Sequence, residues 1–293
     1  MAGTLPVLSG VVPRIQALRG WAQSRRGPLL FAALALFIAG AWLSISQLGL
    51  SLDELQVRPL LIQLAIAPLS LLYAGIGMVL LARSAAISMP LGKATSLSAW
   101  ATLAEALPLP GGAMVRAGAL VAQGTAVSRS SALVLANAGL WISLAALGCG
   151  LVLIGHAQTG AAALALGGAA GSVLAFTWLA RGAGIALAVQ TALHRLSGMA
   201  LIAVRLHFAF LTLGVAIPLT DTLPFALANI AGSAASIAPA GLGISESLAA
   251  AAAGTVKVSP GAAFLAVGLD RLICLAASAL LAFATARQRS EAA

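Results

Sequence analysis

Long apolar runs, separated by short segments that carry arginine, lysine, glycine or proline, dominate the chain. A helix needs about 20 apolar residues to cross the hydrocarbon core of a membrane, and six of the runs reach that length. The pattern therefore predicts an all-α polytopic membrane protein with about six transmembrane helices, in a single transmembrane domain over residues 28–290. The predicted spans are residues 29–50, 58–82, 130–154, 159–180, 199–218 and 261–286.

Two polar segments lie outside these spans. Residues 1–27 contain four arginines, and several apolar residues among them fall near helical spacing, so we expect a cytoplasmic segment that can form an amphipathic surface helix. Residues 181–197, which include His194 and Arg195, are predicted to connect the fourth and fifth spans. The apolar positions of the N-terminal segment are Val11, Val12, Ile15 and Leu18.

Two further apolar regions are interrupted near their middles by proline and glycine. Residues 91–123 contain the break at 108–112, and residues 223–256 contain the break at 239–243. Lipid cannot satisfy the backbone groups that a break exposes, so each break has to lie within protein or beside a water-filled cavity. Each arm is too short to cross a bilayer. We therefore expect two re-entrant helical hairpins.

The two interrupted regions resemble each other. An ionisable residue follows each break, Arg116 six residues after Pro110 and Glu246 seven residues after Pro239. Interrupted segments at corresponding positions of two halves are typical of transporter binding sites. This similarity predicts a repeat, with one unit over about 58–155 and the other over about 198–286. Chance similarity in a chain rich in alanine, leucine and glycine is the alternative.

Charge gives the expected orientation. The 293 residues are 61% hydrophobic and 8% charged, with a net charge of +9, and the basic residues cluster at segment ends. With a cytoplasmic N-terminus, eleven of the 16 lysines and arginines face the cytoplasm, Lys93, Arg181 and Arg195 among them, and only Arg58 and Lys257 lie outside. This split favours a bacterial inner-membrane protein with both termini cytoplasmic, inverted repeats and no nucleic-acid partner.

Arg116 is the candidate ligand at the first break. A guanidinium group can bind a phosphate through two parallel hydrogen bonds, and the backbone N–H groups around Gly111 and Gly112, at a helix N-terminus, favour an anion too. The alternative is a structural ion pair between Arg116 and either Glu105 or Glu246. We expect the Arg116–Glu246 pair if the two breaks meet near the middle of the membrane.

Glu246 is the candidate at the second break, with Gly241, Gly243 and Ser245 beside it. Ser245 is expected to cap the following helix, and Glu246 to act as a counter-charge, a proton carrier or a contact for an amine. The alternative is an acidic side chain that simply favours a helix N-terminus.

Asp270 and Arg271 lie about ten residues into the last span, near the expected bilayer centre. Adjacent residues do not face each other on a helix, so each needs its own partner. Arg205 and His207 are the candidate partners of Asp270, in a structural pair, whereas Arg271 can face a cavity. Trp141 is expected to pack rather than to bind.

Motifs for other chemistry are absent from the sequence. No nucleotide-binding, zinc or nucleophile motif occurs, so we expect neither an enzyme nor a cofactor. Cys149 and Cys274 lie in apolar runs and are expected to pack without a disulfide bond.

The two breaks resemble those of the lysylphosphatidylglycerol synthase transmembrane, or flippase-like, family, over about residues 25–290. Two positions depart from the family pattern: Ala113 stands where the family often has an acid, and Ala240 replaces a glycine. The matching residues are Pro108, Gly112 and Arg116 in the first half, Pro239, Gly241, Leu242, Gly243 and Glu246 in the second, and Arg271 in the last span.

The resemblance implies flippase-like translocation of an anionic or zwitterionic membrane lipid, or assistance to a lipid-modifying enzyme. Larger relatives carry a cytoplasmic aminoacyl-transfer domain that is not found in this sequence, so synthase activity is not expected. A non-transporting partner of a lipid- or glycan-synthesis complex is the main alternative. Buried charges beside the breaks favour translocation, because a scaffold has no use for them. A membrane-embedded lipid enzyme is disfavoured by the missing nucleophile and metal motifs.

Overall fold

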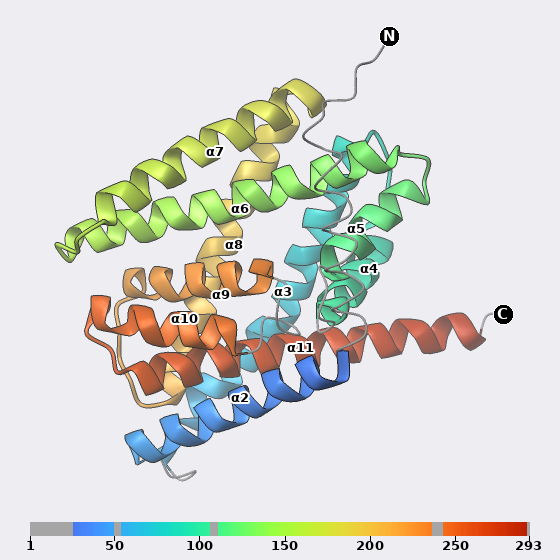
Figure 1. Ribbon diagram of the computed structural model, residues 1–293. Helices are drawn as coiled ribbons and strands as arrows, with labels where there is room; N and C mark the ends of the chain where they lie inside the picture. Colours follow the sequence, from blue (N-terminus) through green and yellow to red (C-terminus); the bar gives the residue numbers. More distant parts are fainter. Residues whose placement is uncertain (1–25, 50–53, 106–110, 236–242, 292–293) are drawn as a thin grey trace.

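A computed structural model describes residues 26–49, 54–105, 111–235 and 243–291, and all regular structure in these ranges is helical (Figure 1). Five helices are long and apolar enough to cross a membrane, which is the character of an all-α, multi-pass membrane protein. They are α3 (Val57–Ser84), α6 (Val127–Gly155), α7 (Ala161–Ala183), α8 (Ile185–Thr212) and α11 (Pro260–Glu291).

The first predicted span also forms a helix, α2 (Arg26–Leu48), which lies along α11 (Figure 1). The described apolar part of α2, Phe37–Leu48, is shorter than a membrane span. The outer faces of the long helices expose large apolar side chains, such as Leu135, Leu174 and Leu280. Apolar surfaces of this kind suit lipid rather than water.

Each interrupted region folds as two short helices packed against each other. The first contains α4 (Leu91–Ala104) and α5 (Gly111–Val121), and the second contains α9 (Leu223–Ala235) and α10 (Ile244–Ala252). In Figure 1 the α4–α5 pair lies to the right and the α9–α10 pair to the left. The breaks themselves, at 106–110 and 236–242, lie outside the described residues. Two short 3₁₀ turns flank the second pair, η2 (Thr220–Thr222) and η4 (Ala253–Val256).

The helical pairs pack reciprocally on the rest of the bundle. Helix α4 of the first pair contacts α11, and helix α9 of the second pair contacts α6. Helices α3 and α8 contact each other directly, and α5 and α10 pack on the helices that follow them, α6 and α11. These contacts of α3–α6 have counterparts among those of α8–α11.

The predicted connector over residues 181–197 is wrong. Helix α7 continues to Ala183, and α8 begins at Ile185, so a single residue, Gly184, joins them. Gly184 has φ +92° and ψ 151°, a region of backbone space that is essentially restricted to glycine. The polar residues of the segment therefore lie inside a long helix, and the fifth span begins at Ile185 instead of Met199.

The core beneath the second pair is built largely from alanine. Ala249 on α10 and Ala262, Ala263 and Ala266 on α11 are fully buried, together with larger side chains such as Phe225. Small side chains let helices approach closely, which is how membrane helices gain packing contacts. This alanine-rich interface fixes α10 against α11 and so positions Glu246.

Candidate functional site

A cavity of about 470 Å³ lies at the centre of the bundle, lined by residues of α3, α4, α5, α6, α8, α9 and α11. Its wall contains three arginines, Arg116, Arg195 and Arg205, and one carboxylate, Glu105. Charged residues inside a membrane bundle are costly and are usually functional. The cavity is therefore the candidate binding site.

Arg116 and Glu105 form an ion pair on the cavity wall. Arg116 Nη2 lies 3.2 Å from Glu105 Oε1, and the two side chains are 32% and 30% exposed. A Cβ added at Gly112 would lie 2.4 Å from Glu105 Oε1, so the glycine makes room for the carboxylate. Gly111 is equally close to the end of α4, since its Cβ would lie 2.0 Å from the Ala104 carbonyl oxygen. The ion pair between Arg116 and Glu105 that the sequence predicted as one alternative is therefore present.

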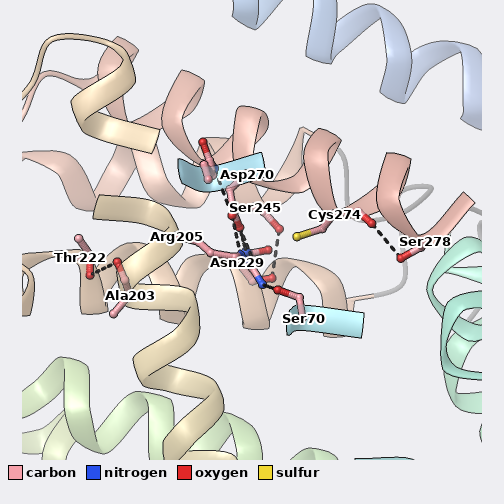
Figure 2. A network of polar contacts seen from close by, with 10 residues as sticks. Ser70, Ala203, Arg205, Thr222, Asn229, Ser245, Asp270, Cys274 and Ser278 are labelled. Atoms are coloured by element: carbon pink, nitrogen blue, oxygen red, sulfur yellow. Dashed lines mark hydrogen bonds and ion pairs between the residues drawn. The ribbon is translucent and has the colours of Figure 1, made fainter. Parts of the chain in front are cut away.

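Arg205 and Asp270 form a second pair, which is almost completely buried (Figure 2). Arg205 donates from Nε to Asp270 Oδ1 and from Nη2 to Asp270 Oδ2, both at 2.8 Å. Arg205 Nη1 also donates to Ser70 Oγ at 2.6 Å. This two-pronged geometry is the strongest that an arginine and a carboxylate can adopt. The predicted Arg205–Asp270 partnership is confirmed, whereas His207, the other candidate, packs edge-on against Phe208.

Two weaker hydrogen bonds complete the surroundings of Asp270. Gln63 Nε2 lies 3.4 Å from Oδ1, and Asn229 Nδ2 lies 3.5 Å from Oδ2. Gln63 of α3, Arg205 of α8 and Asn229 of α9 thus converge on one carboxylate of α11. Figure 2 shows Arg205 and Asn229 of this network, together with Ser70, which accepts a hydrogen bond from Arg205. This network joins the two halves of the bundle.

Glu246 and Arg271 form the third pair. Arg271 Nη1 lies 3.7 Å from Glu246 Oε1, and the Glu246 side chain is completely buried. Glu246 Oε2 accepts a hydrogen bond from the Gly243 N–H at 2.7 Å. Gly243, with φ +82°, stands at the position immediately before α10. Neither Glu246 nor Arg271 is among the described residues that line the cavity.

Two expectations for the second break are wrong. Ser245 does not cap α10: Gly243 occupies that position, and Ser245 Oγ donates to the Asn229 carbonyl oxygen at 3.3 Å (Figure 2). Glu246 pairs with Arg271 and Arg116 pairs with Glu105, instead of Arg116 with Glu246. The reason is local packing. Helix α5, which carries Arg116, packs against α4, which Glu105 directly follows, and helix α10, which carries Glu246, packs against α11, which carries Arg271. Gly241 lies outside the described residues.

Sequence reasoning missed a polar cluster that α3, α6 and α8 contribute to the cavity wall. Arg195 donates from Nε at 2.8 Å, and from Nη2, to Asn137 Oδ1, and its Nη1 lies 3.5 Å from Tyr73 Oη. The guanidinium group lies over the Trp141 ring, 5.0 Å from its centroid, and His194 stacks on Tyr73. Two features of the sequence could have indicated this cluster: Tyr73 is the chain's one tyrosine, and Asn137 interrupts an apolar run.

The arrangement favours binding of an anion. Two of the cavity arginines are paired with carboxylates, and the third, Arg195, is held by neutral groups, so the lining has an excess positive charge. Guanidinium groups bind phosphates and carboxylates with directional hydrogen bonds. Within the described ranges, no group of three or more His, Cys, Asp or Glu residues could hold a metal ion.

Comparison with known protein families finds no family that matches the chain, and comparison with curated proteins finds no match. What the fold and the site define is a class: an all-α, multi-pass membrane protein with a charged central cavity.

Proposed function

We propose that the protein moves an anionic or zwitterionic lipid between the two leaflets of a bacterial inner membrane. The observation that carries this proposal is a cavity with three arginines inside a bundle whose outer surface is apolar. A polar head group can cross the hydrocarbon core only in a shielded polar environment. Such a cavity supplies that environment, whereas a purely structural bundle has no need of one.

The packing supports an alternating-access arrangement. Helices α3–α6 and α8–α11 make corresponding contacts, and each short helical pair packs on the last helix of the other half. We propose that the two units are inverted repeats and that α4–α5 and α9–α10 are re-entrant hairpins entering from opposite sides. With a cytoplasmic N-terminus, the α4–α5 hairpin enters from the cytoplasm. Inverted repeats with a site at their interface are typical of secondary transporters.

In this proposal the head group binds beside the first hairpin. Arg116 and Glu105 are partly exposed to the cavity, so their ion pair can open when a ligand arrives. Arg116 then binds the anionic group, and Glu105 can accept a hydrogen bond from an amine of a zwitterionic head group. Glu246 and Arg271 support the second hairpin from behind.

A second cavity, of about 420 Å³, offers space for acyl chains. It lies between α2, α3, α8 and α11, and apolar residues such as Phe37, Leu60, Phe264 and Leu272 form most of its wall. A lipid whose head group occupies the central cavity needs an apolar environment for its acyl chains, and this second cavity is suited to that purpose.

We further propose that the chain is related to the lysylphosphatidylglycerol synthase transmembrane, or flippase-like, proteins. The glutamate after the second break and the arginine of the last helix, Glu246 and Arg271, are two of the residues that carry the resemblance. These two residues form an ion pair at 3.7 Å. The pair supports the proposed relationship, because it gives the glutamate of one motif and the arginine of the other a common structural role.

The proposed function is tested with purified protein in lipid vesicles that carry a fluorescent phosphatidylglycerol. Wild-type protein should expose inner-leaflet label to a reagent added outside, Arg116→Ala should abolish this transfer, and Arg116→Lys should keep part of it. Arg181→Ala, which changes an exposed arginine at the end of α7, is the matched control. Wild-type protein that moves no lipid, or Arg116→Ala that transfers at the wild-type rate, would contradict the proposal and favour a non-transporting partner.

A further inference from the structure

We propose that Arg195, together with Tyr73 and Asn137, forms a second anion subsite, which binds the phosphodiester group of a lipid. This inference rests on the proposed function only in taking the anion to be part of a lipid. The subsite lies on the α3–α6–α8 wall and is formed by different helices from the Arg116–Glu105 pair.

Arg195 is placed deep in the bundle. It follows the start of α8 by ten residues, which at 1.5 Å per residue is about 15 Å along the helix. A charged arginine at that depth needs polar or anionic partners, because lipid and apolar side chains do not solvate it. Arg195 lines the central cavity, so a ligand there can reach it.

The partners of Arg195 do not neutralise its charge. Arg116 is paired with Glu105 and Arg205 with Asp270, but in the part of the chain that the structure describes no carboxylate lies within ion-pair distance of Arg195. The charge that would balance the cavity is therefore a single negative one, which is the charge of a phosphodiester.

Hydrogen bonding leaves part of the guanidinium group available. Asn137 Oδ1 accepts from both Nε and Nη2, so it occupies one edge of the group. The contact of Nη1 is with Tyr73 Oη at 3.5 Å, at the limit of hydrogen-bond distance. A phosphate oxygen can replace this weak contact and accept from Nη1, while the Tyr73 hydroxyl donates to a second oxygen.

The surrounding aromatic residues hold the subsite in shape. The rings of His194 and Tyr73 stack with centroids 4.1 Å apart, and the Tyr73 and Trp141 rings lie 6.0 Å apart. Gly198 lets these rings pack against α8, because a Cβ there would lie 2.1 Å from Tyr73 Oη. The guanidinium group is thus positioned before a ligand arrives, which lowers the entropic cost of binding.

The test measures binding to purified protein in an uncharged detergent, without transport. The probes are a short-chain phosphatidylglycerol, the diacylglycerol of the same chain length and inorganic phosphate. We expect saturable binding of phosphatidylglycerol and little binding of diacylglycerol. Arg195→Gln should weaken phosphatidylglycerol binding by about tenfold or more, as expected for loss of a charge-assisted hydrogen bond, and the exposed control Arg181→Gln should not change it. Phosphate binding as tight as that of phosphatidylglycerol would identify the free anion as the ligand and overturn the lipid assignment.

A measurement on the wild-type protein covers the case in which the Arg195→Gln variant does not fold. Phenylglyoxal modifies accessible arginines, and mass spectrometry reports the modification of each site. Phosphatidylglycerol should protect Arg195, and diacylglycerol should not. The inference would be overturned if phosphatidylglycerol binds without protecting Arg195, or if the Arg195→Gln variant binds phosphatidylglycerol as tightly as the wild-type protein. Either result would count against the subsite even if the protein moves lipid. Protection of Arg195 in a protein that moves no lipid would support the subsite and contradict the proposed function.

Discussion

Replacing Asp270 by asparagine should destabilise the protein far more than any comparable change on the cavity wall. Asp270 is fully buried and accepts two 2.8 Å hydrogen bonds from Arg205, itself only 7% exposed. Asp270→Asn keeps the volume but removes the charge and turns one acceptor into a donor that faces Arg205. Leaving a buried charge without its partner typically costs about 3–5 kcal/mol of unfolding free energy.

The matched control is Glu105→Gln, which makes the same chemical change in a pair that is about one-third exposed. Solvent screens that pair, so its loss should cost less than about 1 kcal/mol. Ser70→Ala removes one hydrogen bond to Arg205 and should cost about 1–3 kcal/mol, between the two.

The assay is reversible unfolding in mixed micelles of a mild detergent and SDS, followed by circular dichroism. Adding Arg205→Met to Asp270→Asn should recover part of the loss, because it removes the uncompensated charge. Equal losses for Asp270→Asn and Glu105→Gln would refute the reasoning, since they would mean that burial does not set the strength of these pairs.

Two further predictions concern topology and local packing. Single cysteines introduced at Lys93 and Lys257 should be labelled by a membrane-impermeant reagent from the cytoplasmic and the outer side, respectively, and labelling of both from one side would contradict the inverted arrangement. Gly112→Ala should destabilise the α4–α5 pair by about 1–3 kcal/mol, because its Cβ would lie 2.4 Å from Glu105 Oε1, whereas Gly118→Ala in the same helix has open space and should be neutral or slightly stabilising in the same unfolding assay.

The helical framework could be predicted from the sequence because its cause is local. Hydrophobic length marks a span, and proline with glycine marks a break, so predicted spans such as 58–82 and 130–154 agree with α3 and α6 to within a few residues. The Arg205–Asp270 pair was also predictable, since a deeply buried aspartate needs a cation and few were within reach.

Arg195 shows why the rest of the site could not be predicted. The run that contains His194 and Arg195 is predicted as a polar connector because of its charged residues, although the helix that includes it, Ile185–Thr212, is apolar enough to span a membrane. The structure makes it part of α8 because Tyr73 and Asn137, distant in sequence, supply hydrogen bonds inside the bundle. The charge partners of Arg116 and Glu246 likewise depend on which arm packs on which helix. Moving Arg195 into the bundle still leaves ten basic residues on the expected cytoplasmic side against two outside.

Under the proposed topology, helix α7 determines how the second unit is oriented relative to the first. Helices α3–α6 and α8–α11 each comprise two long helices and a short pair, so under the proposed topology each unit crosses the membrane twice and ends on the side where it began. Two such units in tandem would insert in the same direction. One additional crossing between them reverses the second unit, yet α7 contributes no residue to the cavity as described. The reversal itself requires only that α7 be apolar and long enough to span. The side chains of α7 are restricted separately by its close packing on α6, where a Cβ at Gly168 would lie 2.3 Å from the Leu147 backbone nitrogen.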